Sequence, residues 1–477
     1  MRTIIKRKVQ KGVYWIEIPG AGLKILCGCP ADSIKHLIKL GYVASTKKNG
    51  VLFETGPNAI LLSDHLVQNG FLSNLSEFPV LHMFYNQGMI LPKHPNNTGS
   101  KPILIGDKKQ VDAQMAYIFR GNYGLVSEEE YLEMGESKKF AQQNIMLKSR
   151  FAFGRFSPSE EMLDAVHVER EFTEIRAGAK IRKIKSNTFE IQYQNKSVTI
   201  DLNLKSGKKY RPTYRLPKIR LRTPHFGVVH IGEGNGWAPD RPCASSMIVY
   251  NKKLFLIDAG PNITYSLERL GVKPTEIDGI FFTHAHDDHF AGLYSLLLQN
   301  PNLKIYATRV ILSTIIKKYA ALCGLVEKKV EASIHHKDLI IDLWNEYFGM
   351  LVKPILSPHS IDTTIFIFKV IKECQEATYG HFSDITALDW LEKLLVDDSK
   401  RPGITREYLE YTKKNFQLKL TVKKVDVGGP IIHGDEKDFV EDCSDRLILT
   451  HTTQPLTRQQ LKVGDQVAFG EMDTLIK

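Results

Sequence analysis

Short apolar runs bounded by turn-forming residues predict buried strands in the second half of the chain. One run covers residues 277–282, and another covers residues 253–257 and ends in Asp258, which an Ala-Gly-Pro turn follows. The mostly apolar stretch 290–298 predicts a helix directly after the first run. Polar side chains therefore gather in the loops where these predicted strands end and helices begin.

The first 204 residues mix both kinds of pattern. Residues 12–18 predict a short strand, and residues 31–40 predict an amphipathic helix. Loops rich in turn formers, such as 94–100 and 120–124, separate these elements. We therefore expect an α+β accessory domain over residues 1–204. Its role stays open between a substrate-gating or regulatory module and a scaffold that shields one face of another domain.

The candidate chemistry lies in a loop between two of the predicted elements. Thr283-His284-Ala285-His286-Asp287-Asp288-His289 follows the apolar run 277–282 and places three histidines and two aspartates within seven residues. Imidazole nitrogens and carboxylates are the usual ligands of zinc, manganese and ferrous iron. Since the loop holds at least four potential ligands, the sequence predicts that it begins two adjacent metal sites.

At these residues the chain resembles the metallo-β-lactamase superfamily, whose His-x-His-x-Asp-His signature is met in full. Further positions fit the family's other motifs, each near the end of a predicted strand: Asp258, His359, Asp384 and His451. The resemblance covers residues 225 to 455 and implies an αββα sandwich, an α/β fold of two face-to-face sheets with helices outside. Its weakest member is Asp384, because the family more often shows Ser-Gly-Asp there and His381 lies three residues away.

The resemblance also implies two divalent metal ions, with zinc expected and manganese or iron as alternatives. The first ion would be held by His284, His286 and His359. The second would be held by Asp288, His289 and His451, with Asp384 bridging both. Such a pair lowers the pKa of a shared water, so that hydroxide is available for hydrolysis at neutral pH. Asp288 is thus a catalytic candidate as well as a ligand, and Asp258 is a second catalytic candidate that would orient a ligating histidine.

Each downstream position also has a structural alternative. His359 follows a proline and could cap a turn, and Asp384 could be the N-cap of a helix over residues 385–396. His451 could be a strand-end histidine that hydrogen-bonds only to backbone. Together, however, these residues reproduce the order and the strand-end setting of a whole ligand set, which favours the metal sites.

His433 is the candidate proton donor. It follows the stretch 425–432 and lies eighteen residues before His451. It resembles the histidine of ribonuclease Z and related phosphodiesterases that protonates the leaving group. A general acid of this kind contributes about 10² to 10⁴-fold in rate when an alkoxide leaves. The structural alternative is a histidine packed beside Gly428 and Gly429 for its shape alone.

The charge balance favours anionic partners. The chain has 64 Lys and Arg against 53 Asp and Glu, a formal charge of +11 and a pI near 9.1. Basic residues are densest over Lys205 to Arg222, where Tyr210 and Tyr214 are interspersed. This stretch is either a phosphate-binding strip with stacking aromatics or a solvated linker. We take residues 205–224 as a linker and residues 225–477 as the catalytic domain.

Six cysteines without Cys-x-x-Cys spacing favour a reduced, cytoplasmic protein. No signal-peptide core and no long apolar run predict export or a membrane segment. The expected partner is an anionic small molecule or a nucleic acid, with no membrane contact, and a homo-oligomer stays open.

The function expected from these residues is that of a dinuclear metal-dependent phosphodiesterase acting on cyclic nucleotides or nucleic acid. One alternative is hydrolysis of an ester, thioester or lactam, for which His433 would matter little. A second alternative is a non-catalytic, metal-binding regulatory protein.

Overall fold

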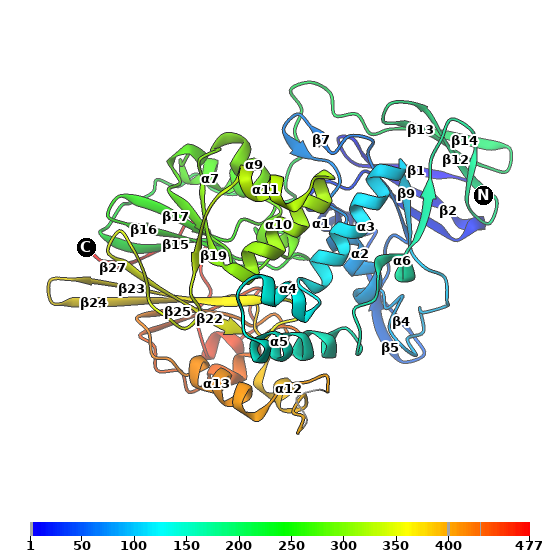
Figure 1. Ribbon diagram of the computed structural model, residues 1–477. Helices are drawn as coiled ribbons and strands as arrows, with labels where there is room; N and C mark the ends of the chain where they lie inside the picture. Colours follow the sequence, from blue (N-terminus) through cyan, green and yellow to red (C-terminus); the bar gives the residue numbers. More distant parts are fainter. Residues whose placement is uncertain (1–2, 398–400, 430) are drawn as a thin grey trace. The chain divides into compact units, whose positions relative to one another are not determined.

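The computed structural model describes residues 3–397, 401–429 and 431–477, which form two compact units (Figure 1). Unit 1 comprises Met1–Phe119, Ser157–Thr213 and Tyr319–Val326. Unit 2 comprises Arg120–Phe156, Tyr214–Lys318 and Glu327–Lys477. The chain thus passes from one unit to the other inside the basic stretch, and unit 2 also takes up a segment from within the first 204 residues.

Unit 1 is built on two sheets. The six-stranded sheet has the order β1-β2-β3-β6-β9-β10, and the four-stranded sheet β11-β12-β13-β14 is antiparallel throughout. Apolar side chains of both sheets, among them Ile25, Leu61 and Ile191, share one buried core, because alternate residues of each strand point inward. The strands are β1 (Ile5–Gln10), β2 (Val13–Ile18), β3 (Leu23–Cys27), β6 (Ala59–Leu61), β9 (Ile103–Gly106), β10 (Asp164–His167), β11 (Thr173–Arg176), β12 (Ala179–Lys185), β13 (Thr188–Tyr193) and β14 (Lys196–Asp201).

Helices and small hairpins complete unit 1. The hairpins are β4 (Ser45–Lys48) with β5 (Val51–Glu54) and β7 (Val67–Gln68) with β8 (Phe71–Leu72). The helices are α1 (Ser33–Lys39), α2 (Glu77–Leu81) and α6 (Ser159–Met162), and α3 (Lys108–Tyr123) begins in this unit. The mixed α/β content expected for the N-terminal region is confirmed.

Unit 2 contains two larger sheets that pack face to face. The first has the order β20-β19-β18-β17-β16-β15-β27, and the second has the order β21-β22-β23-β24-β25-β26. Phe281 of the first sheet and Phe368 of the second lie in one buried core, with ring centroids 5.1 Å apart. The strands are β15 (Phe226–Gly232), β16 (Ser245–Tyr250), β17 (Lys253–Ile257), β18 (Gly279–Phe281), β19 (Lys304–Thr308), β20 (His335–Leu339), β21 (Asn345–Tyr347), β22 (Met350–Ser357), β23 (Thr363–Lys372), β24 (Gln375–Phe382), β25 (Val422–Asp426), β26 (Arg446–Thr450) and β27 (Met472–Ile476).

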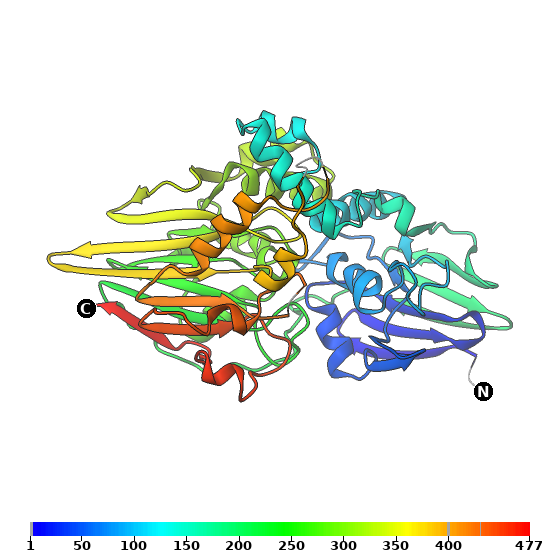
Figure 2. The ribbon, with the colours of Figure 1, turned by 90° about the horizontal axis from the view of Figure 1, so that it is seen from below.

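Helices cover the outer faces of this sandwich. Phe416 of α13 packs with Ile365 and Ile367 of the second sheet, and Figure 2 shows that helix outside the yellow strands. On the other side, α7, α9 and α10 accompany the green strands of the first sheet (Figure 1). The expected αββα sandwich is therefore confirmed for unit 2. Its helices are α4 (Glu128–Glu133), α5 (Lys138–Phe151), α7 (Ile263–Leu270), α8 (Asp287–Phe290), α9 (Leu293–Gln299), α10 (Arg309–Cys323, which ends in unit 1), α11 (Glu327–Ser333), α12 (Leu388–Glu392) and α13 (Arg406–Phe416).

The basic stretch is less solvated than a free linker would be. Tyr210 is buried in unit 1, where its hydroxyl accepts a hydrogen bond of 3.3 Å from Gln68 Nε2. Tyr214 is buried as well, while the lysines and arginines around both rings are exposed. Because both tyrosine rings are buried, they are not available to stack on bases. A phosphate-binding role of this stretch would therefore rest on its exposed lysines and arginines alone.

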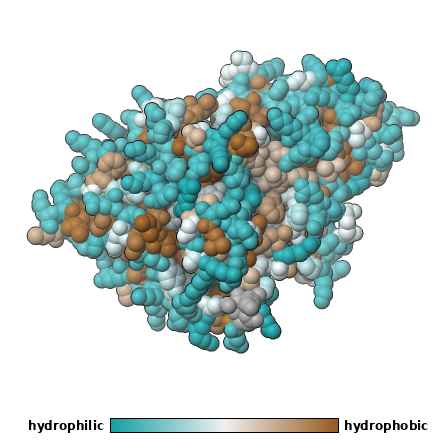
Figure 3. All heavy atoms as spheres, in the orientation of Figure 1, coloured by the Kyte–Doolittle hydropathy of each residue, from teal (hydrophilic) through white to brown (hydrophobic). Residues whose placement is uncertain are grey.

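Hydrophilic residues cover most of the face drawn in Figure 3, and the apolar patches on it are small and separate. Among the described residues, no helix has the length and apolar character needed to cross a bilayer.

Candidate metal centre

The sequence-predicted ligands come together at one edge of the unit 2 sandwich, because they all follow the ends of strands that meet there. Parallel strands bring their carboxyl ends to the same edge of a sheet, and this applies to β17 and β18 in the first sheet and to β24, β25 and β26 in the second. The side chains concerned are Asp258 after β17; His284, His286, Asp288 and His289 after β18; His359 after β22; Asp384 after β24; and His451 after β26.

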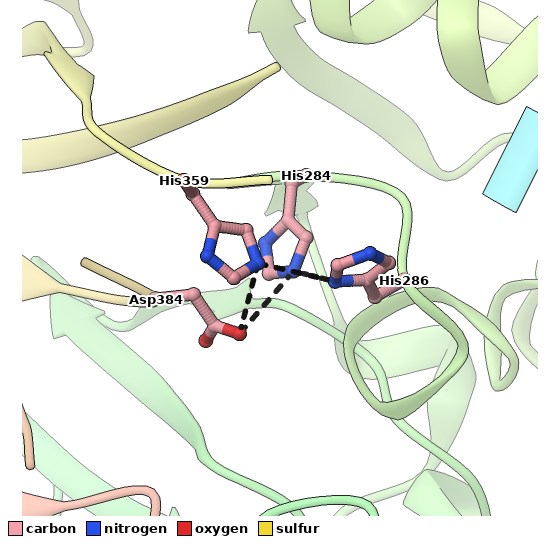
Figure 4. A group of neighbouring side chains, drawn as sticks. All are labelled: His284, His286, His359 and Asp384. Carbon is pink, nitrogen blue, oxygen red and sulfur yellow. Dashed lines mark hydrogen bonds and ion pairs between the residues drawn. The ribbon is translucent and has the colours of Figure 1, made fainter. Parts of the chain in front are cut away.

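The first cluster joins three histidines and one aspartate, all buried (Figure 4). His286 Nδ1 lies 3.1 Å from His284 Nε2 and 3.3 Å from His359 Nε2. Asp384 Oδ2 lies 3.7 Å from His284 Nε2 and 3.5 Å from His359 Nε2. Three ring nitrogens and a carboxylate oxygen thus converge on one point.

The second cluster shares Asp384 with the first. His289 Nε2 lies 3.2 Å from His451 Nε2, and Asp288 Oδ2 lies 3.2 Å from the same nitrogen of His451. Asp384 Oδ1 lies 3.1 Å from His289 Nε2 and 3.3 Å from His451 Nε2. The two oxygens of Asp384 therefore face different clusters, which is the arrangement that a bridging carboxylate requires.

The donor set fits a pair of divalent cations. In the first cluster, ring nitrogens approach one another within hydrogen-bond distance at two places, and lone pairs that face each other there repel unless a proton or a cation lies between them. Asp288 Oδ1 is buried and has no hydrogen-bond partner, so it is free to bind a cation. Imidazole and carboxylate donors suit zinc, manganese and iron alike.

Burial and the neighbouring carboxylates together set the charge of the ligating rings. Burial lowers the pKa of His284 well below its usual value and that of His359 to about 4, so both rings are in the neutral, metal-binding form at pH 7. His451 differs: burial again favours the neutral ring, but Asp384 and Asp426 outweigh it and raise its pKa to about 10. Metal binding at His451 therefore displaces a proton.

Asp258 orients one predicted ligand, His289. Its Oδ2 lies 2.8 Å from His289 Nδ1, which leaves His289 Nε2 facing the second cluster. The same carboxylate accepts hydrogen bonds from the Thr283 backbone at 2.8 Å and from the Thr283 hydroxyl at 2.7 Å. The strand end that carries Asp258 is thus tied to the start of the ligand loop.

His433 lies beside the clusters, with 16% of its side chain exposed. Its Nδ1 is 3.0 Å from Asp426 Oδ2, and its ring centroid is 4.7 Å from that of His451. Sequence reasoning missed Asp426. The sequence signal was weak, because Asp426 ends the buried strand β25, whose sequence Val-Lys-Lys-Val-Asp is not an apolar run. A buried carboxylate behind a partly exposed histidine fixes the tautomer and orientation of that ring.

The structural alternative that the sequence raised for Asp384 is wrong. Asp384 does not cap a helix over 385–396, because α12 begins only at Leu388 and its N-cap is Ala387. His381 does not compete for the site, because its Nδ1 lies 2.9 Å from the hydroxyl of Tyr379 and neither ring nitrogen belongs to a metal-holding group among the described residues.

Comparison with known proteins finds similarity over the part of the chain that carries the ligand loop. The family model of the metallo-beta-lactamase superfamily matches residues 238–313. Over 96 residues the chain is 38% identical to ribonuclease Z of Clostridium kluyveri, a match that spans 20% of this chain and 30% of that protein. Over 102 residues it is 31% identical to the cGMP-dependent 3',5'-cGMP phosphodiesterase A of Dictyostelium discoideum, spanning 21% of this chain and 12% of that one. The chain thus covers less than a third of the length of either relative.

A solved structure, the short form of human tRNase Z (ELAC1), aligns with 52% of this chain and 99% of its own, with a TM-score of 0.38 and 18% identity. The fold assignment itself rests on the strand order and the packing of the two sheets. The matched residues 238–313 include the ligand loop, so this part of the chain is similar to the metallo-β-lactamase superfamily. Within that superfamily, its sequence resembles the branch of ribonuclease Z and the cyclic nucleotide phosphodiesterases.

Proposed function

We propose that the chain is a dinuclear metal-dependent phosphodiesterase that acts on cyclic nucleotides or nucleic acid. The observation that carries this proposal is His433, a partly exposed histidine at the rim of the two clusters with Asp426 behind it. Proton donation to an alkoxide leaving group needs such a residue, and opening of a lactam does not.

The protein's own side chains have separate tasks in this reaction. Two bound divalent ions would supply a nucleophile at neutral pH and neutralise charge on the phosphate, with Asp384 holding their separation. Asp426 accepts the Nδ1 proton of His433, so the opposite ring nitrogen, Nε2, presents its proton to the leaving oxygen. The net charge of +11 attracts a polyanionic substrate.

A substrate panel tests the proposal against the two alternatives. The purified chain, reloaded with zinc or manganese, is assayed on bis-p-nitrophenyl phosphate, cyclic nucleotides, a short RNA, a thioester and nitrocefin. Turnover confined to the phosphodiesters supports the proposal. Turnover only of the thioester or nitrocefin favours the ester, thioester or lactam hydrolase, and absence of turnover with both metals bound favours the regulatory protein.

Replacing Asp426 by asparagine is expected to slow hydrolysis of a natural phosphodiester by about 10 to 100-fold, as loss of an orienting carboxylate typically does. The amide presents a weaker acceptor to His433 Nδ1 and releases the ring's tautomer. Because Asp426 Oδ1 also lies 3.5 Å from His451 Nδ1, bound metal is counted in parallel by mass spectrometry. The expected result is slower turnover with metal retained, and an unchanged rate would contradict the role given to Asp426.

A further inference from the structure

Unit 1 repeats the strand plan of the unit 2 sandwich. Read from β1 to β10, the pairings in its six-stranded sheet are antiparallel, antiparallel, parallel, parallel and parallel. Read from β15 to β20, the first sheet of unit 2 gives the same series. In both units four antiparallel strands follow, β11 to β14 in unit 1 and β21 to β24 in unit 2. In the order of elements, helix α1 follows the third strand of its sheet as α7 does, and α3 precedes the last strand of its sheet as α10 does.

The correspondence extends to individual hydrogen bonds. Gly28 N donates to Leu61 O at 2.8 Å, and Asp258 N donates to Phe281 O at 2.9 Å. Gly28 and Asp258 both follow the third strand and both have positive φ, at 83° and 61°. The last paired residues of β3 and β6 are Cys27 and Leu61, and the last paired residues of β17 and β18 are Ile257 and Phe281. Both parallel strand pairs therefore end directly before Gly28 or Asp258.

The helix that follows ends in the same way in both units. Gly41 and Gly271 each have a φ of 73° at the end of α1 and α7, a conformation that favours glycine. Tyr42 N donates to Leu37 O, and Val272 N donates to Leu267 O, both at 2.9 Å. From residue 28 to residue 42 the counterparts differ by a constant 230 in number, so this stretch aligns without a gap.

Unit 1 has other residue types at the positions that correspond to the predicted ligands and to Asp258. Gly28 replaces Asp258, and two residues after the next strand Ser63-Asp64 replaces Thr283-His284. Cys29 N donates to Ser73 O as Ala259 N donates to His289 O, so Ser73 stands in place of His289. The four-stranded sheet of unit 1 has no counterparts of β25 and β26, the strands that bring Asp426 and His451 to the centre.

At the place in unit 1 that corresponds to the metal centre, the side chains of Asp64 and Asn187 form hydrogen bonds within the protein. Asp64 N donates to Asn187 Oδ1 at 3.0 Å, and Asn187 N donates back to Asp64 Oδ2 at 2.5 Å. Asn187 lies in the turn between β12 and β13, which corresponds to the loop that carries His359 between β22 and β23. Lys183 Nζ forms an ion pair of 2.9 Å with Asp64 Oδ2, so a cation is already supplied there by the chain.

We infer that unit 1 is a second copy of the metallo-β-lactamase strand plan that has lost its metal centre, leaving a single centre in the chain. Among the described residues, the three groups able to hold a metal ion all lie in unit 2. The accessory region is thus a non-catalytic partner of the same fold rather than an unrelated domain.

An experimental structure of the full, metal-loaded chain tests this inference, with an anomalous difference map collected at the absorption edge of the metal. The expected map has peaks only among His284, Asp288 and their neighbours in unit 2. A peak at Asp64, or a different strand order in unit 1, would overturn the inference. A map without any peak would defeat the proposed function instead, and the strand order would still test the repeat.

A second observation concerns the loop that carries His359. This loop, residues 358–362, joins β22 to β23 and ends in Asp362, which is buried. Asp362 Oδ2 forms an ion pair of 2.6 Å with Lys148 Nζ of α5, whose side chain is only 1% exposed. Asp362 Oδ1 accepts a hydrogen bond from the hydroxyl of Tyr131 in α4, and Asp362 Oδ2 accepts one from Leu125 N at 3.2 Å.

The helical segment 120–156 is thus anchored on the loop of a predicted ligand. Lys148 Nζ also donates to the backbone oxygens of Tyr123 and Leu125. Gly124 has a φ of 63°, and a Cβ there would lie 2.7 Å from Asp362 Oδ2, so the backbone approaches this carboxylate as closely as glycine permits. Breaking one partner leaves an uncompensated buried charge three residues from His359.

Resting on the proposed function, the geometry points to Lys148 and Asp362 as positioning residues for His359 and hence for the first metal site alone. The second cluster takes its ligands from the loops after β18, β24 and β26, whereas Lys148 Nζ binds Asp362 and the backbone oxygens of Tyr123 and Leu125. Loss of a partner that orients a ligand typically costs about 10 to 100-fold in metal affinity.

The test is chelator competition on the full chain, with metal equivalents counted at each chelator concentration. Lys148→Met is expected to lose one equivalent at about 10 to 100-fold lower chelator concentration than wild type, while the other equivalent is held as before. Lys139→Met is the matched control, because Lys139 lies on the same helix in an exposed ion pair with Glu407.

Asp362→Asn serves as a second variant that keeps the shape of the side chain, in case Lys148→Met fails to fold. It is expected to show the same selective loss of one equivalent. Parallel loss of both metals, or retention of both at wild-type affinity, would overturn the positioning role. A wild-type chain that binds no metal would count against the proposed function, not against the selectivity of these residues.

Discussion

Replacing Asp384 by alanine is expected to abolish hydrolysis of every substrate together, with a loss of at least about 10³-fold, as for other groups on which the whole catalytic unit depends. Its two oxygens face different clusters, at 3.5 Å from His359 Nε2 and 3.1 Å from His289 Nε2. Removing the side chain therefore weakens both metal sites at once. Initial rates on an activated and a natural-type phosphodiester measure the effect.

Asp389→Ala provides the control for this experiment, because Asp389 is an exposed residue of α12 five positions further along the chain. It should retain wild-type rates and metal content. If Asp384→Ala kept both metals and most of its activity, the bridging position would be wrong and the two clusters would be independent.

Replacing His433 by alanine is expected to give the second-largest effect, and a selective one. Hydrolysis of a cyclic nucleotide or RNA, whose leaving alkoxide needs a proton, should fall by about 10² to 10⁴-fold. Bis-p-nitrophenyl phosphate should be much less affected, because p-nitrophenolate leaves readily without a proton. The comparison is the ratio of the two rates in wild type and variant.

Bound metal should stay unchanged in His433→Ala if the metals occupy the two clusters, because their ligands do not include His433; a metal in the third possible group, which joins His433 to Asp384, Asp426 and His451, would be lost. Equal losses on both substrates would instead mean that His433 binds a metal or only shapes the rim. His433 Nδ1 lies 3.7 Å from Asp384 Oδ2, which is close enough for both atoms to bind one metal ion. Metal content is therefore measured on the same preparation as the rates.

The ligand loop could be predicted from the sequence because its chemistry is local. Four candidate ligands fall within six residues after an apolar strand, and a parallel strand end directs them to one edge of the sheet. His359 and His451 were found through the order of strand ends in the family that the chain resembles. Their contacts with His286 and His289 span 73 and 162 residues, which no local pattern reveals.

Other features depend on long-range packing that periodicity does not encode. Asp426 was missed because a single aspartate at a strand end has many structural explanations until His433 is seen beside it. The segment 120–156 lies in the sequence among unit 1 strands, yet it packs in unit 2, where Lys148 and Asp362 meet across 214 residues. Buried charges such as these appear in a sequence only as ordinary lysines and aspartates.

The unit 1 repeat was hidden for a related reason. The residues that mark the family are its ligands, and unit 1 has glycine, aspartate and serine where Asp258, His284 and His289 stand in unit 2. What remains is strand pairing, helix caps and positive φ angles, which tolerate many side chains. Topology can therefore persist after every recognisable motif has gone.

Counting metal per chain tests the central claim most directly. Inductively coupled plasma mass spectrometry on the full chain, purified without chelators and then equilibrated with zinc or manganese, should find close to two equivalents, one for each of the two clusters that Asp384 joins. A folded chain that binds no metal under any of these conditions would contradict the metal centre and the phosphodiesterase built on it.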